Sequence, residues 1–520
     1  MPLFNPRQLT ATKSLSEFEA EAGHTGLNRI LNKWSLTALG IGCIIGAGIF
    51  VMTGLAAREF AGPALTISFL VAGIGCACAA LCYAEFASIL PVAGSAYSYS
   101  YATMGELFAW IIGWDLIIEY SMSSSTVAVG WSGYFVKLME SFGVHFPLWA
   151  VNDPETAHGL ISKATANGTL ADLATHYSSI DLPTIAGFGI AINLPAVLVS
   201  LLVMFILTKG IKEAANTNVA MVILKVSVVL FVIIVGAFFV DINNWDPFIP
   251  MRGVNDHGDA AFGVPGILTA AAYVFFAYIG FDAVSTQAGE ALNPKKDIPF
   301  GILASLAICT ALYILVSLVL TGMVKYTDLD INAPVAAAFS AKGMKFASWF
   351  ISIAAVAGLT SVLLVNILAQ TRLFFSMAKD GLLPDNFFGK LHSKFKTPFN
   401  ATIITGIAIA VVAGIFPLSV IAKLVNIGTL FAFVIIIIAV FMMRRKNPDT
   451  KRGFRVPALP FIGALGIMFN VGMMISLGWE NWLRLFLWMA VGLVIYWFYG
   501  QKNSRLNKKN IESINQNTKS

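Results

Sequence analysis

The chain has 520 residues, of which 57% are hydrophobic and only 12% are charged. This balance lies far outside the range of soluble globular domains, so the sequence is that of a polytopic membrane protein. The net charge of +6 does not indicate nucleic-acid binding, because the basic residues are spread over many loops without interleaved aromatic residues.

Apolar runs long enough to cross about 30 Å of hydrocarbon can be marked twelve times along the chain. They lie near residues 35–57, 63–90, 106–135, 188–208, 217–240, 264–289, 299–323, 346–377, 399–416, 419–443, 457–477 and 481–500. No stretch alternates between apolar and polar residues as the strands of a membrane barrel do. We therefore predict an all-α membrane protein with twelve transmembrane helices, numbered 1 to 12 in chain order.

The distribution of basic residues predicts the orientation. Most of the 34 Lys and Arg residues fall in segments that are cytoplasmic if the N-terminus is cytoplasmic, so both termini are expected on the cytoplasmic side of the cell membrane. Residues 1–34 form an N-terminal tail without the features of a removable signal peptide. Residues 501–520 form a C-terminal tail, which is polar, basic and disordered from residue 502 onward. An extracellular loop covers 136–187, and 324–345 contains a lid-like interfacial helix.

The reactive residue types argue against an enzyme or an ATP-driven pump. All five cysteines lie inside predicted spans without ligand-type spacing, so we interpret them as packing residues. All six histidines lie in tails or loops, which leaves no intramembrane metal site and no histidine base. No Gly-rich loop ends in Gly-Lys-Ser/Thr, and no cofactor is expected.

Helix 1 contains five glycines between residues 37 and 54. Each glycine costs about 1 kcal/mol relative to alanine in a helix and lets the backbone leave the helix. One interpretation is close helix packing through Gly42 and Gly46. The other is an unwound binding site at Gly46, Ala47 and Gly48, because a bilayer tolerates broken helix only where it faces protein, water or a ligand.

Helix 6 is interrupted as well, since Gly280 stands beside Asp282 in the middle of this span. Two interrupted helices five spans apart are typical of transporters that are built from inverted repeats. The expected divisions are 35–240 for the first five-helix repeat, 264–443 for the second and 457–500 for two further helices.

Six strings stand in chain order over helices 1 to 8. They are GIGCIIGAGIFVMTG (40–54), CYAEFASILPVAGSAYSYSY (82–101), GWDLIIEYSMSSSTVAVGWSGY (113–134), NVAMVILKVSVVL (218–230), FFAYIGFDAVSTQAGEALNPKKDIPFGI (275–302) and RLFFSMAKDGLLP (372–384). Together they resemble the amino acid–polyamine–organocation superfamily, and within it the bacterial relatives of the cationic amino acid transporters. The resemblance implies two five-helix inverted repeats with two further helices, and amino acid transport by alternating access.

An amino acid brings a carboxylate and an ammonium that must be desolvated together. Half-helices offer N–H groups for the carboxylate and carbonyl groups for the ammonium. By similarity to the family, the amides around Gly46, Ala47 and Gly48 receive the carboxylate. The carbonyls that the resemblance assigns to the ammonium are those of Ile45, Phe276, Ala277 and Ile279. The resemblance also makes the Phe276 ring a gate over the substrate. From the sequence alone, Phe276 can equally be an ordinary core residue.

Lys225 lies about six residues into helix 5, where a charged side chain is costly unless it is paired or faces a cavity. Its stem can also extend to the interface. The family offers a third role, because a lysine in proton-linked relatives fills the place of the sodium ion between helices 1 and 8. The resemblance therefore implies sodium-independent, proton-coupled symport, with amino acid exchange as the alternative.

Other polar residues lie within or at the ends of spans. Asp115 and Glu119 share one face of helix 3, either as structural partners or as a counter-charge or proton station. Asp282 is placed to brace the break in helix 6, and Glu85 is interpreted as a gate or loop anchor. Asn366 on helix 8 either shapes selectivity, as the family fold implies, or makes an interhelical hydrogen bond.

Two rival classes remain from the sequence. A channel also uses polar breaks to line its pore, and a permease-like sensor binds without transport, although the short tails do not favour it. The expected partners are an amino acid, protons and the lipid bilayer. The oligomeric state is unknown.

Overall fold

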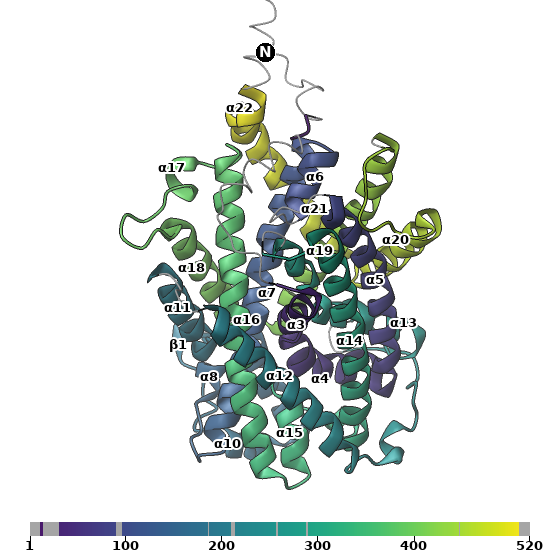
Figure 1. Ribbon diagram of the computed structural model, residues 1–520. Helices are drawn as coiled ribbons and strands as arrows, with labels where there is room; N and C mark the ends of the chain where they lie inside the picture. Colours follow the sequence, from purple (N-terminus) through teal and green to yellow (C-terminus); the bar gives the residue numbers. More distant parts are fainter. Residues whose placement is uncertain are drawn as a thin grey trace, which may run out of the picture.

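The computed structural model describes residues 11–13, 31–89, 96–185, 187–209, 214–255, 258–287, 290–446 and 448–508. The described chain is mostly helical (Figure 1). Within it, seven helices are long and apolar enough to cross a membrane, and three further apolar helices are shorter. The polytopic helical architecture is confirmed, and the count of twelve spans stays a prediction.

The long helices make up the body of the molecule. They are α5 (Leu65–Ile89), α7 (Glu106–Glu140), α11 (Leu194–Lys209), α12 (Ala214–Ala237), α14 (Pro294–Met323), α16 (Lys345–Lys379), α18 (Phe399–Ile415), α19 (Leu418–Lys446), α20 (Leu459–Ser476) and α21 (Trp479–Ile495). The short helices between and after them are α6 (Ala96–Thr103), α8 (Leu148–Val151), α9 (Pro154–Asn167), α10 (Leu170–His176), η4 (Ile242–Trp245), η7 (Tyr326–Asp328), α15 (Pro334–Ala341), α17 (Asp385–Phe388), η8 (Tyr496–Gly500) and α22 (Gln501–Asn503). Helices 1 and 6 consist of several pieces and are described with the site.

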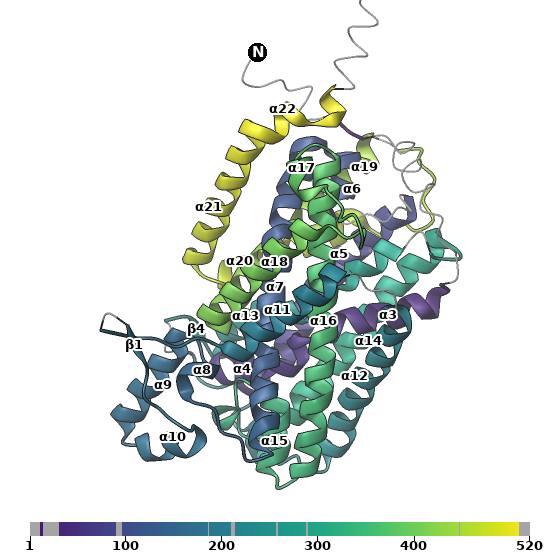
Figure 2. The same cartoon turned by 90° about the vertical axis from the view of Figure 1, so that its left-hand side faces the viewer.

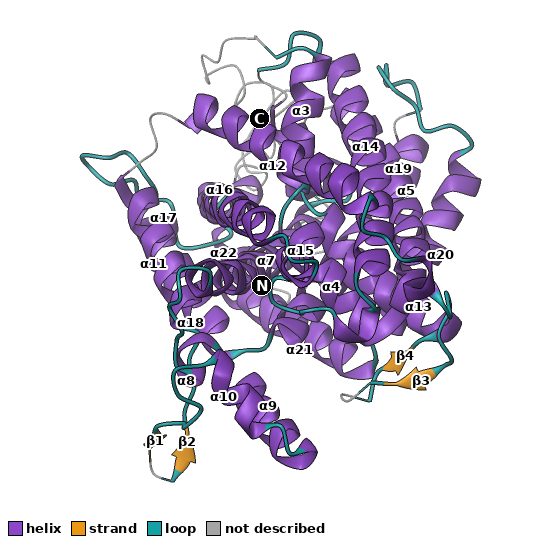
Figure 3. Ribbon diagram, turned by 90° about the horizontal axis from the view of Figure 1, so that it is seen from below, coloured by secondary structure: helices purple, strands orange, loops and turns teal. Residues whose placement is uncertain are grey.

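Two small antiparallel hairpins lie at the periphery (Figure 3). They pair β1 (Thr184–Ile185) with β2 (Phe188–Gly189), and β3 (Gly253–Val254) with β4 (Ala260–Ala261). The first hairpin and helices α8 to α10 give structure to the predicted loop 136–187. The predicted lid-like segment 324–345 contains helix α15.

Helices α10 and α15 lie at one end of the molecule, and α6 and α22 lie at the other (Figures 1 and 2). At the α22 end, the backbone N–H of Lys13 donates to the Tyr101 carbonyl at 3.2 Å. The N–H of Arg505 donates to the Asp380 carbonyl at 3.0 Å. Described residues from both termini therefore lie at the same end, and their cytoplasmic placement stays a prediction.

The prediction that the chain is disordered from residue 502 onward is wrong for residues 502–508, while 509–520 lie outside the described residues. Ser504 is fully buried, and its hydroxyl donates to the carboxylate of Glu106. That buried carboxylate also accepts from the hydroxyls of Tyr101 at 3.1 Å and Tyr496 at 2.9 Å. The segment is ordered because a buried carboxylate needs several donors, and Ser504 supplies one of them.

The helices pack in two groups. The α5 group contains α3 (Lys33–Ile44), α5, α13 (Gly263–Val274) and α14, in which α14 packs along both α5 and α3. The α7 group contains α7, α11, α16 and α18, in which α16 packs along α7 and α11 packs along α18. Helix α19 contacts both α7 and α5, so it lies at the boundary between the groups.

Candidate functional site

Helix 1 is interrupted at Ile45 and Gly46, so the predicted unwound segment is confirmed at Gly46 and is wrong for Ala47 and Gly48, which are helical. Its pieces are α3 (Lys33–Ile44), η1 (Gly48–Met52), α4 (Thr53–Ala56), η2 (Ala57–Ala61) and η3 (Gly62–Ala64). The Asn32 side chain caps the start of α3 by accepting two backbone N–H groups. Helix α3 ends because Ile45 is extended, with φ −72° and ψ 103°. The helix resumes at Ala47 and continues through wide π-helical turns, which are frequent at functional sites.

Helix 6 is interrupted at Ile279 and Gly280. Helix α13 passes into the 3₁₀ turn η5 (Phe275–Tyr278), and η6 (Phe281–Gln287) follows the break. Ile279 has φ −60° and ψ 133°, and Gly280 has φ +112°. Residues other than glycine rarely adopt such a φ, so the backbone turn at this position requires glycine.

The two interrupted segments touch each other directly. A Cβ at Gly48 would overlap the Cα and Cβ of Ala277, and a Cβ at Gly280 would lie 2.9 Å from the Cys43 carbonyl oxygen. Both glycines therefore permit close backbone approach between helices 1 and 6. Sequence positions that lie more than 200 residues apart meet in one site.

Tyr313 on α14 joins the two breaks and was not singled out by the sequence. Its hydroxyl lies 2.9 Å from the carbonyl oxygen of Ile44 and 2.8 Å from that of Ala277. These carbonyls belong to the last turn before each break, where backbone acceptors lose their helical partners. The only sequence signal was a tyrosine within an apolar span, which core packing explains equally well.

Lys225 on α12 is 2% exposed, so its side chain does not extend to the membrane interface. The ammonium donates to the Gly42 carbonyl of α3 at 3.2 Å. Its stem packs on α16 at Gly358, where a Cβ would lie 3.1 Å from Lys225 Cγ. The lysine therefore contacts both helix 1, two residues before the end of α3, and helix 8, which is α16.

The residues that the resemblance assigns to the substrate lie in or next to the two breaks, where helices 1 and 6 touch. Ile45, Ala47, Phe276 and Ala277 are buried, and Ile279 is partly exposed. The Phe276 carbonyl accepts the Ile279 N–H at 3.2 Å, and the Ala277 carbonyl accepts from Tyr313. Each carbonyl has two lone pairs, so one acceptor position remains on each of them.

Two polar residues of α16, Asn366 and Gln370, form hydrogen bonds to α7. Asn366 Nδ2 donates to the Ser123 hydroxyl at 3.0 Å. One turn further on, Gln370 donates to the Ile117 carbonyl at 3.2 Å. The α16 residue that faces the unwound segment is Val362, which would lie 3.3 Å from a Cβ at Gly46. Asn366 thus makes the interhelical hydrogen bond that the sequence left open, although it is only partly buried.

The three carboxylates considered above as structural or coupling groups have different surroundings. The Asp282 carboxylate lies near the backbone N–H groups of residues 280, 282 and 283, directly after the break in helix 6. Glu119 is 4% exposed and lies near Asp282 and Asp115. Asp115 is fully buried, and neither of its oxygens has a hydrogen-bond partner within the described chain.

Comparison with known proteins identifies the family. The model of the amino acid permease family matches residues 31–500, which is nearly the whole chain. The chain belongs to the amino acid permease family.

Its relatives include the methylthioribose transporter of Bacillus subtilis, with 44% identity over 95% of this chain and 98% of the relative. The branched-chain amino acid permease BcaP of the same organism is 44% identical over 94% and 97%. Cationic amino acid transporter 3 of Arabidopsis thaliana is 38% identical over 83% of this chain and 65% of the relative. These relatives are transporters and permeases, and the chain is a multi-pass membrane permease rather than an enzyme.

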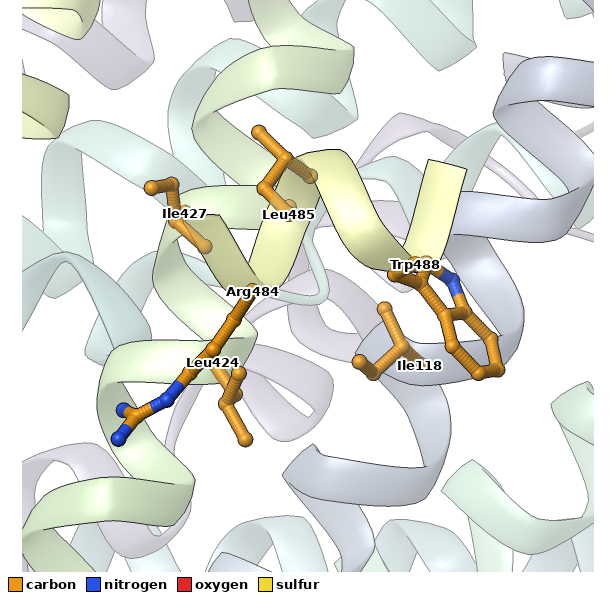
Figure 4. A pocket seen from close by; sticks show the side chains of 7 residues that line it. Ile118, Leu424, Ile427, Arg484, Leu485 and Trp488 are labelled. Carbon is orange, nitrogen blue, oxygen red and sulfur yellow. The ribbon is translucent and has the colours of Figure 1, made fainter. Parts of the chain in front are cut away.

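Close to Asp115, the permease has a small cavity between α7, α19 and α21 (Figure 4). Its lining residues are Ile118, Leu424, Ile427, Gly428, Arg484, Leu485 and Trp488. Arg484 directs its guanidinium away from Trp488, toward Asn481 at 3.1 Å. A Cβ at Gly428 would lie 2.8 Å from Asp115 Oδ1, so this glycine separates the carboxylate from the cavity. The cavity contains none of the predicted substrate contacts.

Glu85 anchors a loop of the permease, as its position at the end of α5 suggests. Its fully buried carboxylate binds Arg444 through Nε at 2.9 Å and Nη2 at 2.5 Å. Arg452 Nε lies 3.2 Å away, and the Val456 N–H donates at 2.7 Å. The bidentate arginine and the further donors satisfy a carboxylate that would otherwise be costly to bury. The loop between α19 and α20 is thereby tied to α5.

Proposed function

We propose that this permease is a secondary active amino acid transporter of the cell membrane, with both termini in the cytoplasm. It works by alternating access as a sodium-independent, proton-coupled symporter. The observation that carries the proposal is the contact between two interrupted helices, with a buried lysine hydrogen-bonded two residues from one of the breaks. The relatives' names support small-molecule uptake, since one is a branched-chain amino acid permease and another a cationic amino acid transporter.

The substrate site lies between the two breaks. The amides around Gly46, Ala47 and Gly48 stand at the start of the second half of helix 1, where free N–H groups and the helix dipole attract a carboxylate. The ammonium is received by the carbonyls of the breaks, namely those of Ile45, Phe276, Ala277 and Ile279. Phe276 covers the bound substrate, and Asn366 contributes to side-chain selectivity.

Lys225 replaces a bound sodium ion in this proposal. An ammonium that binds a carbonyl of α3 while its stem packs on α16 holds helices 1 and 8 together, as a coordinated cation does. Loss of the proton from Lys225 removes the charge that favours this contact. The protonation state of Lys225 therefore biases the transporter between its open and closed conformations. Asp115 and Glu119 are further candidates for structural or coupling carboxylates, and Asp282 braces helix 6.

The proposal is tested by uptake of labelled leucine, arginine and alanine into proteoliposomes with imposed gradients. We expect an inward proton gradient to accelerate uptake severalfold and a sodium gradient to have no effect. Lys225→Ala is expected to abolish acceleration by the proton gradient, with Lys423→Ala as a control. The control lysine pairs with Asp259 at 2.8 Å, away from the breaks. Sodium dependence without pH dependence, or normal proton coupling in Lys225→Ala, contradicts the proposal.

Amino acid exchange is the alternative mechanism, because an exchanger can use the same half-helix site. Uptake that requires internal amino acid and ignores the proton gradient identifies an exchanger. Conductance far above carrier rates indicates a channel, and binding without flux indicates a sensor. A thermal-stabilisation screen over the twenty amino acids and methylthioribose identifies the ligand, since a ligand of the folded state raises its apparent stability.

A further inference from the structure

A single buried hydroxyl joins three elements at the α15 end of the molecule. Tyr134 on α7 is fully buried, and its hydroxyl donates to the Phe50 carbonyl of η1 at 2.6 Å. The two aromatic rings also pack edge to face, with centroids 6.1 Å apart. The backbone N–H of Val335, in the first turn of α15, lies against the same hydroxyl. We call these three residues the Tyr134 junction.

The backbone around the Tyr134 junction is tightly packed. A Cβ at Gly133 would lie 2.6 Å from the Asn332 carbonyl oxygen, and a Cβ at Gly54 would overlap Pro334. The segment that leads into α15 therefore fits between α7 and the second half of helix 1. A Cβ at Gly130, one turn before Tyr134, would lie 2.7 Å from Val51 Cγ2. The second half of helix 1 is therefore packed closely against α7 and against the segment before α15.

The junction crosses the boundary between the two helix groups. Tyr134 belongs to α7, whereas η1 packs on η5 and α13 of helix 6. Phe50 lies only two residues after Gly48 in the same helical segment. A movement of this segment away from α7 would open the site at the α15 end, and it would have to break the hydrogen bond to Tyr134.

We propose that Tyr134 is a positioning residue that holds the second half of helix 1 against α7 and thereby keeps the outer side of the substrate site closed. This inference rests on the proposed alternating access, in which the α15 end is extracellular. The net contribution of one hydrogen bond corresponds to about a two- to tenfold change in an equilibrium constant. Removing the hydroxyl therefore shifts the population toward the outward-open state by this factor.

The test measures the opening directly and does not require a substrate. Spin labels are attached at Glu59→Cys, at the outer end of helix 1, and at Ser141→Cys, just after α7. Cys43→Ser serves as the background, because Cys43 is the partly exposed native cysteine and the other four are buried. Pulsed electron paramagnetic resonance then compares the label distances in full-length Tyr134 and Tyr134→Phe protein. We expect the fraction of long distances, relative to the short ones, to rise about two- to tenfold in the variant.

Tyr278→Phe is the matched control. The Tyr278 hydroxyl is equally buried and donates to the Phe69 carbonyl at 2.8 Å, but this bond joins η5 to α5 and does not involve α7. This variant loses a comparable hydrogen bond without loosening the boundary between the groups, so its distances should match those of the unsubstituted protein. Equal distance distributions in Tyr134→Phe and Tyr278→Phe, with the same loss of thermal stability, overturn the proposal.

A second variant reaches the same boundary by a different route. Gly130→Ala places a methyl group against Val51 and is expected to increase the long-distance fraction, and Val51→Ala in the same chain should reverse this increase. If Gly130→Ala and the double variant Gly130→Ala/Val51→Ala give the same label distances, the proposed boundary is contradicted.

Transport in oriented proteoliposomes distinguishes this inference from the proposed function. Tyr134→Phe should lower the KM for external substrate and raise the KM for internal substrate, each by about two- to tenfold. If the chain moves no amino acid and the distances still shift, the proposed function fails and the role of Tyr134 stands. If transport is normal and neither the distances nor the KM ratio changes, the role of Tyr134 fails alone.

Discussion

Helices 1 and 6 are interrupted for different physical reasons. In helix 1 the break is made by Ile45, whose extended φ and ψ are open to any residue. The glycines around it provide space instead, since a Cβ at Gly42 would overlap Val222 and one at Gly48 would overlap Ala277. In helix 6 the break needs glycine itself, because Gly280 has φ +112°.

This difference resolves the two interpretations of the glycine-rich segment in helix 1. Close packing and unwinding occur together there, at neighbouring positions. Gly42 serves packing against α12, whereas Gly46 stands at the break, where the nearest atoms to an added Cβ belong to the side chain of Val362. A glycine in an interrupted span therefore marks either a close contact or a special backbone conformation, and substitutions can separate these cases.

Gly48→Ala is expected to have the largest effect. The added methyl group would overlap backbone atoms of Ala277, which cannot move without displacing helix 6. Such overpacking costs about 3 kcal/mol of folding free energy, and it separates the two breaks that form the site. We expect a clear fall in the thermal unfolding temperature in detergent and loss of uptake. Gly46→Ala is the matched control for the unfolding temperature alone, since its methyl group would meet Val362 at 3.3 Å and no backbone atom of helix 6. Equal unfolding temperatures for the two variants would show that helix 6 yields easily.

Gly280→Ala is expected to have a smaller effect on stability, of about 2 kcal/mol, because alanine is strained at this φ. Its Cβ would also lie 2.9 Å from the Cys43 carbonyl oxygen. The control is Gly472→Ala in α20, where a Cβ meets no atom within 4 Å. That substitution should leave the unfolding temperature unchanged or raise it slightly, since alanine favours the helix. A Gly280→Ala protein as stable as the control would argue against a fixed backbone turn in helix 6.

The sequence predicted the features that depend on local composition. Apolar length predicted a multi-spanning helical protein, and glycine placement predicted interruptions in helix 1 and at Gly280, which the structure contains. Lys225 was conspicuous because a lysine within a span needs a partner, and Gly42 supplies it. The inverted repeat and the division of the chain stay predictions.

Features that depend on contacts between distant helices could not be predicted in the same way. Tyr313 and Tyr134 are tyrosines in apolar helices, and only the fold shows which carbonyl groups their hydroxyls meet. The order of residues 502–508 depends on Glu106, almost 400 residues earlier in the chain. Local polarity therefore predicted a disordered tail, whereas Ser504 in this segment is a hydrogen-bond partner of the buried Glu106 carboxylate.

The smallest expected effect concerns selectivity and compares the two ends of the hydrogen bond between Asn366 and Ser123. If the amide also reaches the substrate, Asn366→Ser should change the ratio of arginine to leucine uptake about two- to tenfold, the range of one hydrogen bond. Ser123→Ala removes the bonding partner from α7 but leaves the amide in place, so it should leave the ratio unchanged. Competition uptake at several concentrations of each amino acid measures the ratio independently of expression. An unchanged ratio in Asn366→Ser, or the same change in both variants, would restrict Asn366 to joining α16 and α7, and Val362 would then be the α16 residue that contacts the substrate.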